Sequence, residues 1–80
     1  MTNLNIKTTA RHDVIKIIRE ARFRCGEDEL GMVIFLETKA KEYIKIASRL
    51  KDSAIRNLNL LIAREIVRVR ERLIETAIFG

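Results

Sequence analysis

Apolar residues recur at intervals of three and four positions along three stretches of this chain, a spacing that predicts three amphipathic α-helices. The first helix is expected over Ala10–Arg24, with Thr8 or Thr9 as the capping side chain. Gly26 follows, at the place where a helix-ending residue in the left-handed conformation is expected. The apolar face of this helix consists of Ala10, Val14, Ile17, Ile18, Ala21 and Cys25.

The second helix is expected to begin after Glu27–Glu29, because negative charge stabilises a helix N-terminus, and to end near Lys51. Its apolar positions alternate between spacings of three and four residues, as in the seam of a coiled coil. They are Val33, Leu36, Ala40, Tyr43, Ala47, Leu50 and, just beyond the expected end, Ala54.

The connection to the third stretch has two interpretations. Asp52 and Ser53 are good helix-capping residues, but neither glycine nor proline enforces a turn. A short turn at Lys51–Ser53 would fold a third helix back against the second, whereas the other interpretation is one long, kinked helix. We favour the turn, because a continuous helix of about 45 residues would leave wide apolar surfaces uncovered in a monomer. The predicted fold class is therefore all-α, a three-helix domain in which the second and third helices form a long antiparallel hairpin.

The third helix, read over Asn57–Phe79, has more apolar surface than a small domain needs. Its apolar side chains cover about half of the circumference, whereas a surface helix typically has an apolar stripe of roughly 100°. We therefore expect this helix to bind another copy of the chain or a different protein. The residues predicted for helix packing and partner contact are Leu58, Ile62, Ile66, Val69, Arg70 and Leu73. In a lone bundle, Leu60, Val67, Ile74 and Ile78 should not all be shielded from solvent.

Arg70 is the one charged residue inside this apolar arc. A guanidinium in such a position needs a carboxylate from another helix or another chain, or must extend its charged end to solvent. We expect Arg70 to lie at an interface.

Arg64, Arg68 and Arg72 lie four residues apart on the polar side of the third helix. This spacing suits contacts with phosphates along a nucleic-acid duplex. Glu71 and Glu75 follow Arg68 and Arg72 by three residues, so ion pairs within the helix are the simpler interpretation.

The first nine residues, Met1–Thr9, are polar, with Leu4 and Ile6 alternating. They are expected to form an extended or disordered N-terminal arm ahead of a helical interaction domain over residues 10–80. Eighty residues make one domain at most.

Composition and charge favour a binding protein in the cytoplasm. The net charge of +5 favours acidic partners such as nucleic acid, and the high isoleucine content without glutamine is typical of thermophiles. No apolar run approaches the roughly 20 residues that span a bilayer, and mixed charges argue against a membrane-surface helix. The single Cys25 excludes an internal disulfide and suits a reducing compartment.

No residue set in the chain predicts catalysis, a metal, another cofactor or a small-molecule substrate. His12 is the only histidine, and it has no partners at catalytic or metal-binding spacing. Cys25 lies on the apolar face of the first helix, where a small buried residue is expected. We expect a protein that is not an enzyme.

The stretch Ile55–Ala77 resembles the signature helix of GINS subunits, which belong to the replicative helicase assembly of archaea and eukaryotes. The family has a helix with a pattern like I-x-x-R-x-R-x-x-K-I, and Ile66–Ile74 is its nearest counterpart here. The order of helices over residues 12–79 is also similar in outline. Two features differ: the family's small β-rich domain has no counterpart before Gly80, and the connecting segment Cys25–Gly31 is short.

The resemblance implies a non-catalytic scaffold or accessory subunit of an archaeal-type DNA replication complex, either GINS-like or a polymerase accessory subunit. Such a chain would bind its protein partner through apolar helix faces and could meet DNA inside the larger complex. The alternative is a small, basic, helical DNA-binding protein of the histone-like or nucleoid kind, with Arg64, Arg68 and Arg72 on the nucleic acid. A histone, however, has a short last helix, whereas the third helix here is as long as the second.

Overall fold

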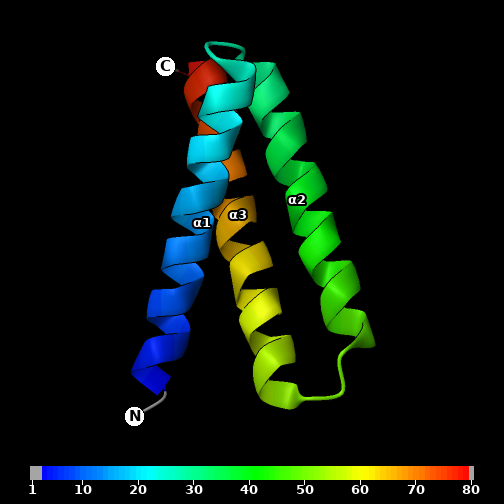
Figure 1. Ribbon diagram of the computed structural model, residues 1–80. Coiled ribbons are helices and arrows are strands. Elements are labelled where there is room, and N and C mark those ends of the chain that lie inside the picture. The colour runs from blue at the N-terminus through cyan, green and yellow to red at the C-terminus, as the bar shows by residue number, and fades with distance from the viewer. Residues whose placement is uncertain (1–2, 80) are drawn as a thin grey trace.

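Three α-helices in an up-down-up arrangement form the part of the chain that the structure describes, which is residues 3–79 of a computed structural model, with side chains for residues 6–78. They are α1 (Asn3–Cys25), α2 (Glu29–Arg49) and α3 (Ser53–Phe79) (Figure 1). The most extensive interface lies between α2 and α3. The prediction of an all-α, three-helix domain with an antiparallel hairpin of the second and third helices is confirmed.

The start of α1 differs from the prediction. The helix begins at Asn3 rather than Ala10, so the expected arm is helical from its third residue, and neither Thr8 nor Thr9 is a cap. The reason is that Ile6 lies four residues before Ala10 and extends the apolar face of α1 by one turn, with its side chain half-buried. The first two residues of the expected arm, Met1 and Thr2, lie outside the described residues.

Gly26 ends α1 as predicted. Its φ is +59°, the left-handed region in which glycine is unstrained, and its N–H donates to the Arg22 carbonyl at 2.9 Å. The next helix is capped by Asp28, whose Oδ1 accepts a 2.9 Å hydrogen bond from the Gly31 N–H. One carboxylate of the acidic segment thus caps α2, and the others supply negative charge near its first turn.

The turn between α2 and α3 is confirmed, and a single long helix is excluded. The second helix ends at Arg49, two residues before the expected Lys51, and residues 50–52 form the connection. Asp52 caps α3, because its Oδ1 accepts hydrogen bonds from the N–H groups of Ala54 at 2.9 Å and Ile55 at 3.2 Å.

The core lies where the three helices meet. Leu36 and Ile66 are fully enclosed there, at 0% exposure. Four of the ten core residues are alanine, which lets the helices approach closely. The core consists of Ala10, Val14, Ile17, Ala21, Met32, Leu36, Ala40, Ile62, Ala63 and Ile66.

The predicted seam of the second helix is only partly internal. Leu36, Ala40 and Ala47 are buried, and Val33, Tyr43 and Leu50 are half-buried. Ala54 is exposed because it follows the turn and belongs to α3.

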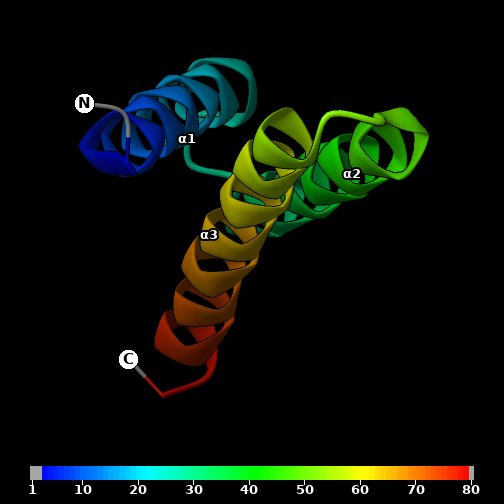
Figure 2. The same cartoon turned by 90° about the horizontal axis from the view of Figure 1, so that it is seen from below.

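The longest helix, α3, sets the shape of the molecule. At 1.5 Å per residue its 27 residues span about 40 Å, which matches the 39 Å long axis. Viewed from below, α1 and α2 flank α3 on different sides (Figure 2). The third helix therefore borders α2 along one flank, borders α1 along the other, and turns a third side outward.

Candidate functional site

The flank of α3 next to α2 retains exposed apolar side chains. Successive helical residues are rotated by about 100°, so when Ile66 points into the core, Val67 points sideways and Leu60 and Ile74 follow the same line. Leu60 is 42% exposed, Ile74 36% and Ile78 67%, while Val67 is half-buried. Three of these four residues are exposed, which confirms the expectation that a lone bundle would not shield every one of them.

The second helix adds apolar residues to the same side of the molecule. Glu37 of α2 pairs with Arg70 of α3, and this antiparallel register sets Ile34 near the level of Ile74. Ile34 is 57% exposed, and its helical angle places it outward of Glu37. We call the combined surface the hairpin face; it consists of Leu30, Ile34, Ile44, Leu60, Val67, Ile74 and Ile78.

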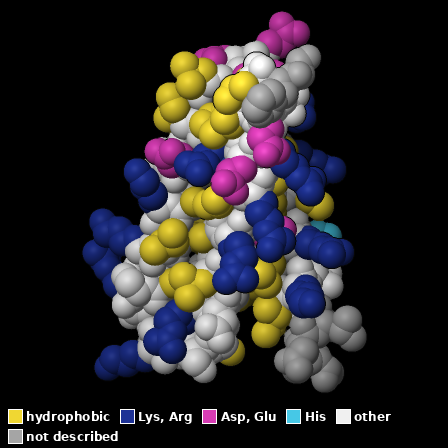
Figure 3. Space-filling view, turned by 180° about the vertical axis from the view of Figure 1, so that it is seen from behind, with side chains coloured by type: hydrophobic (Ala, Val, Ile, Leu, Met, Phe, Trp, Pro, Cys, Tyr) yellow, Lys and Arg dark blue, Asp and Glu magenta, His cyan; other side chains and the backbone are white. Residues whose placement is uncertain are grey.

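The hairpin face is interrupted by charged side chains. From behind, hydrophobic side chains form a broken band over α2 and α3, with acidic and basic side chains between them (Figure 3). Exposed apolar side chains gathered over two adjacent helices are typical of surfaces that bind proteins.

Arg70 connects the two helices of the hairpin. Its Nη1 donates to Glu37 Oε2 at 2.9 Å, and Lys41 Nζ lies 3.6 Å from Glu37 Oε1. The Arg70 side chain is 25% exposed, and its Nε is buried with no hydrogen-bond partner in the described part of the chain. The carboxylate that the sequence requires for Arg70 is therefore supplied by another helix of the same chain.

The residues predicted for partner contact serve mainly the internal packing. Ile62 and Ile66 are 2% and 0% exposed, so neither is available to a partner in this fold. Leu58, Val69 and Leu73 are half-buried and pack against the core. Ile62 and Ile66 therefore serve the helix packing predicted for this set, because α1 and α2 both pack against the side of α3 that carries them. Partner contact by the other residues stays a prediction.

The α2 residues of the hairpin face were not predicted from the sequence. Leu30 and Ile34 are an apolar pair four residues apart that lies outside the seam of α2. Such a pair outside the buried stripe is the signal that identifies them.

A groove lined mostly by basic side chains lies between α1 and α3. It has a volume of about 300 Å³ and is lined by Lys7, Ala10, Arg11, Leu61, Arg64, Glu65 and Arg68. Two of the three arginines predicted for contact with nucleic acid, Arg64 and Arg68, thus line the groove together with two cations of α1, whereas Arg72 does not line it.

The ion pairs of Arg68 and Arg72 differ from those predicted. Arg68 Nη1 lies 3.1 Å from Oε2 of Glu65, three residues earlier, and among residues 6–78 no ion pair joins Arg68 to Glu71. Among residues 6–78, no ion pair joins Arg72 to Glu75. A carboxylate on the N-terminal side of its basic partner suits the helix dipole, which favours the observed pair.

Three other titratable residues, Tyr43, His12 and Cys25, lie outside the hairpin face and the groove. Burial of Tyr43, together with the nearby negative charges of Asp13 and Glu42, raises the pKa of its hydroxyl. His12 is exposed, and Cys25 is half-buried against the core.

Within the described part of the chain, no three His, Cys, Asp or Glu side chains are grouped so that they could hold a metal. None of the helices described there is both long and apolar enough to cross a membrane.

Comparisons of this chain with protein-family models, with curated proteins and with solved structures found no match. The similarity to GINS subunits therefore rests on the sequence pattern of Ile55–Ala77 and stays a prediction.

Proposed function

We propose that this chain is a non-catalytic interaction subunit that binds another protein through the hairpin face. The observation that supports this proposal most strongly is the row of exposed isoleucine and leucine side chains along α2 and α3. Fully burying such a side chain contributes roughly 1.5–3 kcal/mol. Covering the six exposed isoleucine and leucine side chains of the face therefore favours association by several kcal/mol. A partner that covers the face also explains why the third helix has an apolar arc wider than its own fold needs.

The partner that fits this face is an acidic protein with an apolar helix. Two packed helices present a ridged surface, onto which a third helix packs with its own apolar stripe. A second copy of this chain fits less well, because both copies would have a net charge of +5. An acidic partner is attracted by the same charge.

The proposal extends to a role in archaeal-type DNA replication in the cytoplasm of a thermophile. This extension is supported by the GINS-like pattern of Ile66–Ile74 and by the composition. A scaffold subunit of this kind holds other replication proteins together and needs no catalytic group of its own.

Affinity capture from an extract of the organism that carries the chain tests the proposal. Three baits are compared: the native chain, the face variant Ile34→Glu/Ile74→Glu, and a control, Phe23→Glu/Ile46→Glu. The control introduces the same two charges at residues that are 90% and 49% exposed and lie outside the hairpin face.

We expect one protein to be captured by the native and control baits and lost with the face variant. Capture that is equal with all three baits, or absent with the native bait, would refute binding through the face. A captured partner from outside the replication machinery would refute the replication role alone.

A further inference from the structure

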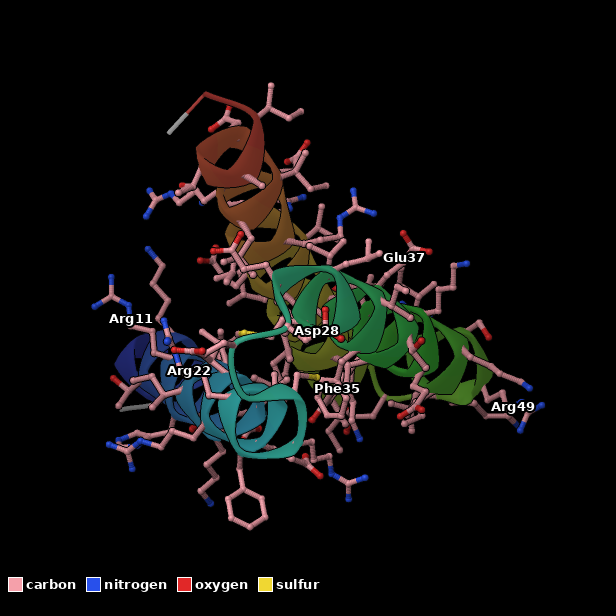
Figure 4. All side chains as sticks on the ribbon, turned by 90° about the horizontal axis from the view of Figure 1, so that it is seen from above. Arg11, Arg22, Asp28, Phe35, Glu37 and Arg49 are labelled. Carbon is pink, nitrogen blue, oxygen red and sulfur yellow. The ribbon has the colours of Figure 1, made fainter. Side chains whose placement is uncertain are left out.

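The groove between α1 and α3 has a large excess of positive charge. Lys7 and Arg11 come from α1, Arg64 and Arg68 come from α3, and Glu65 is the only acidic residue in the lining. Viewed from behind, Lys and Arg side chains gather over the side where α3 meets α1 (Figure 3). From above, Arg11 projects from α1 at the side of the molecule opposite Arg49 (Figure 4).

Most of these charges have no ion-pair partner among residues 6–78. Among residues 6–78, Lys7, Arg11 and Arg64 take part in no ion pair, and only Arg68 is paired, with Glu65. The lining therefore has a net charge of +3 in one groove of about 300 Å³. Like charges held this close repel one another, and a bound polyanion would remove this cost.

We propose that the α1–α3 groove binds the sugar–phosphate backbone of a nucleic-acid duplex. Arg64 and Arg68 are four residues apart on one helix, a rise of about 6 Å, so they reach successive anionic groups rather than a single one. The two cations of α1 face them across the groove. Four long basic side chains on two rigid helices suit a ligand with repeated phosphates, whereas a single small anion would leave most of them unpaired.

The lining also determines how the nucleic acid is read. None of the seven lining residues is aromatic, so the groove has no platform on which unpaired bases could stack. Its apolar floor, Ala10 and Leu61, offers no hydrogen-bonding side chain to a base edge. We expect the four cations of the lining to contact phosphates, so binding should be independent of sequence.

This site does not depend on the proposed function. The hairpin face lies on the flank of α3 next to α2, and the groove lies on the flank next to α1, so a protein and a duplex can be bound at the same time. A chain with both surfaces would tether its protein partner to nucleic acid.

Fluorescence anisotropy with a short labelled DNA duplex of mixed sequence tests the proposal with the purified chain. The groove variant is Arg11→Glu/Arg64→Glu, and the control is Lys45→Glu/Arg49→Glu on the exposed side of α2. Both variants have the same net charge, so a difference between them reports the site and not overall charge. All four residues are exposed, and circular dichroism verifies that each variant is folded.

With four phosphate contacts the logarithm of the association constant should fall with the logarithm of salt concentration with a slope of about −3.6. The groove variant should bind at least about tenfold more weakly at low salt and reduce the magnitude of that slope by about 2. The control should change the affinity less than about threefold, since it removes no contact.

A milder variant, Lys7→Ala/Arg11→Ala, should reduce the slope in the same direction and covers the case in which charge reversal perturbs α1. The absence of duplex binding at low salt would overturn the proposal, as would equal losses in the groove variant and the control. Tighter binding of single-stranded DNA or of polyglutamate than of the duplex would also overturn it.

Discussion

Replacing Arg70 by methionine removes the charge from the middle of the hairpin but keeps an unbranched side chain of similar size. Two opposing contributions decide the effect on the free energy of unfolding. The ion pair with Glu37 is lost, and because Glu37 is 46% exposed this pair is worth only about 0.5–1 kcal/mol. The buried Nε, which has no hydrogen-bond partner, is also removed, and such a group costs about 1–3 kcal/mol.

The two contributions nearly cancel or favour the variant. We therefore expect Arg70→Met to leave the free energy of unfolding unchanged or to raise it by about 1 kcal/mol. Arg70→Ala should instead lower it by about 1–2 kcal/mol, because the alkyl stem that packs between the helices is lost as well. The comparison separates the packing of the side chain from its charge.

Urea unfolding followed by far-ultraviolet circular dichroism measures these changes, provided that the slope with denaturant stays constant. A double-mutant cycle with Glu37→Gln isolates the pair, with an expected coupling of about 0.5–1 kcal/mol. Destabilisation by more than about 2 kcal/mol in Arg70→Met would refute this reasoning and would make the ion pair a main stabilising contact of the hairpin.

Three further predictions concern the core, a helix cap and the hydroxyl of Tyr43. Ile66→Ala should lower the free energy of unfolding by about 2–5 kcal/mol because Ile66 is fully buried, whereas Ile74→Ala on the hairpin face should cost much less; urea unfolding of both variants checks this. Asp52→Ala should cost about 1 kcal/mol by removing the cap of α3, and Asp52→Asn should restore most of it; equal losses in the two variants would contradict a capping role. The pKa of Tyr43 is higher in the folded chain than in the unfolded chain, whose tyrosine ionises near pH 10. The unfolded chain therefore loses this proton first as pH rises. The stability that the neutral hydroxyl contributes below about pH 10 is lost as pH rises through the folded pKa. The Tyr43→Phe variant should lack this part of the decline in stability with rising pH. Near-ultraviolet titration of the single tyrosine should give a pKa above that of the unfolded chain, and an unshifted titration would exclude the effect.

The sequence alone is sufficient to predict the features that depend on interactions between neighbouring residues. Gly26 ends α1 because it alone in that segment adopts a positive φ without strain, and Asp52 begins α3 because its carboxylate reaches the first free N–H groups. Helix spacing likewise predicts all three helices. The predicted start of α1 is wrong because the four-residue spacing between Ile6 and Ala10, and not the alternation of Leu4 and Ile6, decides the structure of this segment.

The features that join distant segments could not be predicted from the sequence alone. The Arg70–Glu37 pair spans 33 positions and depends on the register between α2 and α3. The basic groove exists because α1 places Lys7 and Arg11 beside Arg64 and Arg68, which helical periodicity within either segment does not indicate. The width of the apolar arc of α3 predicted surplus surface, but the packing of α1 and α2 decided which of its residues are buried.

Site-specific photo-crosslinking in the cells that carry this chain tests the proposed hairpin-face interaction most directly. A photoreactive amino acid is placed at Ile34, at Ile74 or, as a control, at Phe23, which is 90% exposed on α1. The account predicts that Ile34 and Ile74 form adducts with the same protein and that Phe23 forms none. No adduct from either face position, or an equal yield from Phe23, would contradict it.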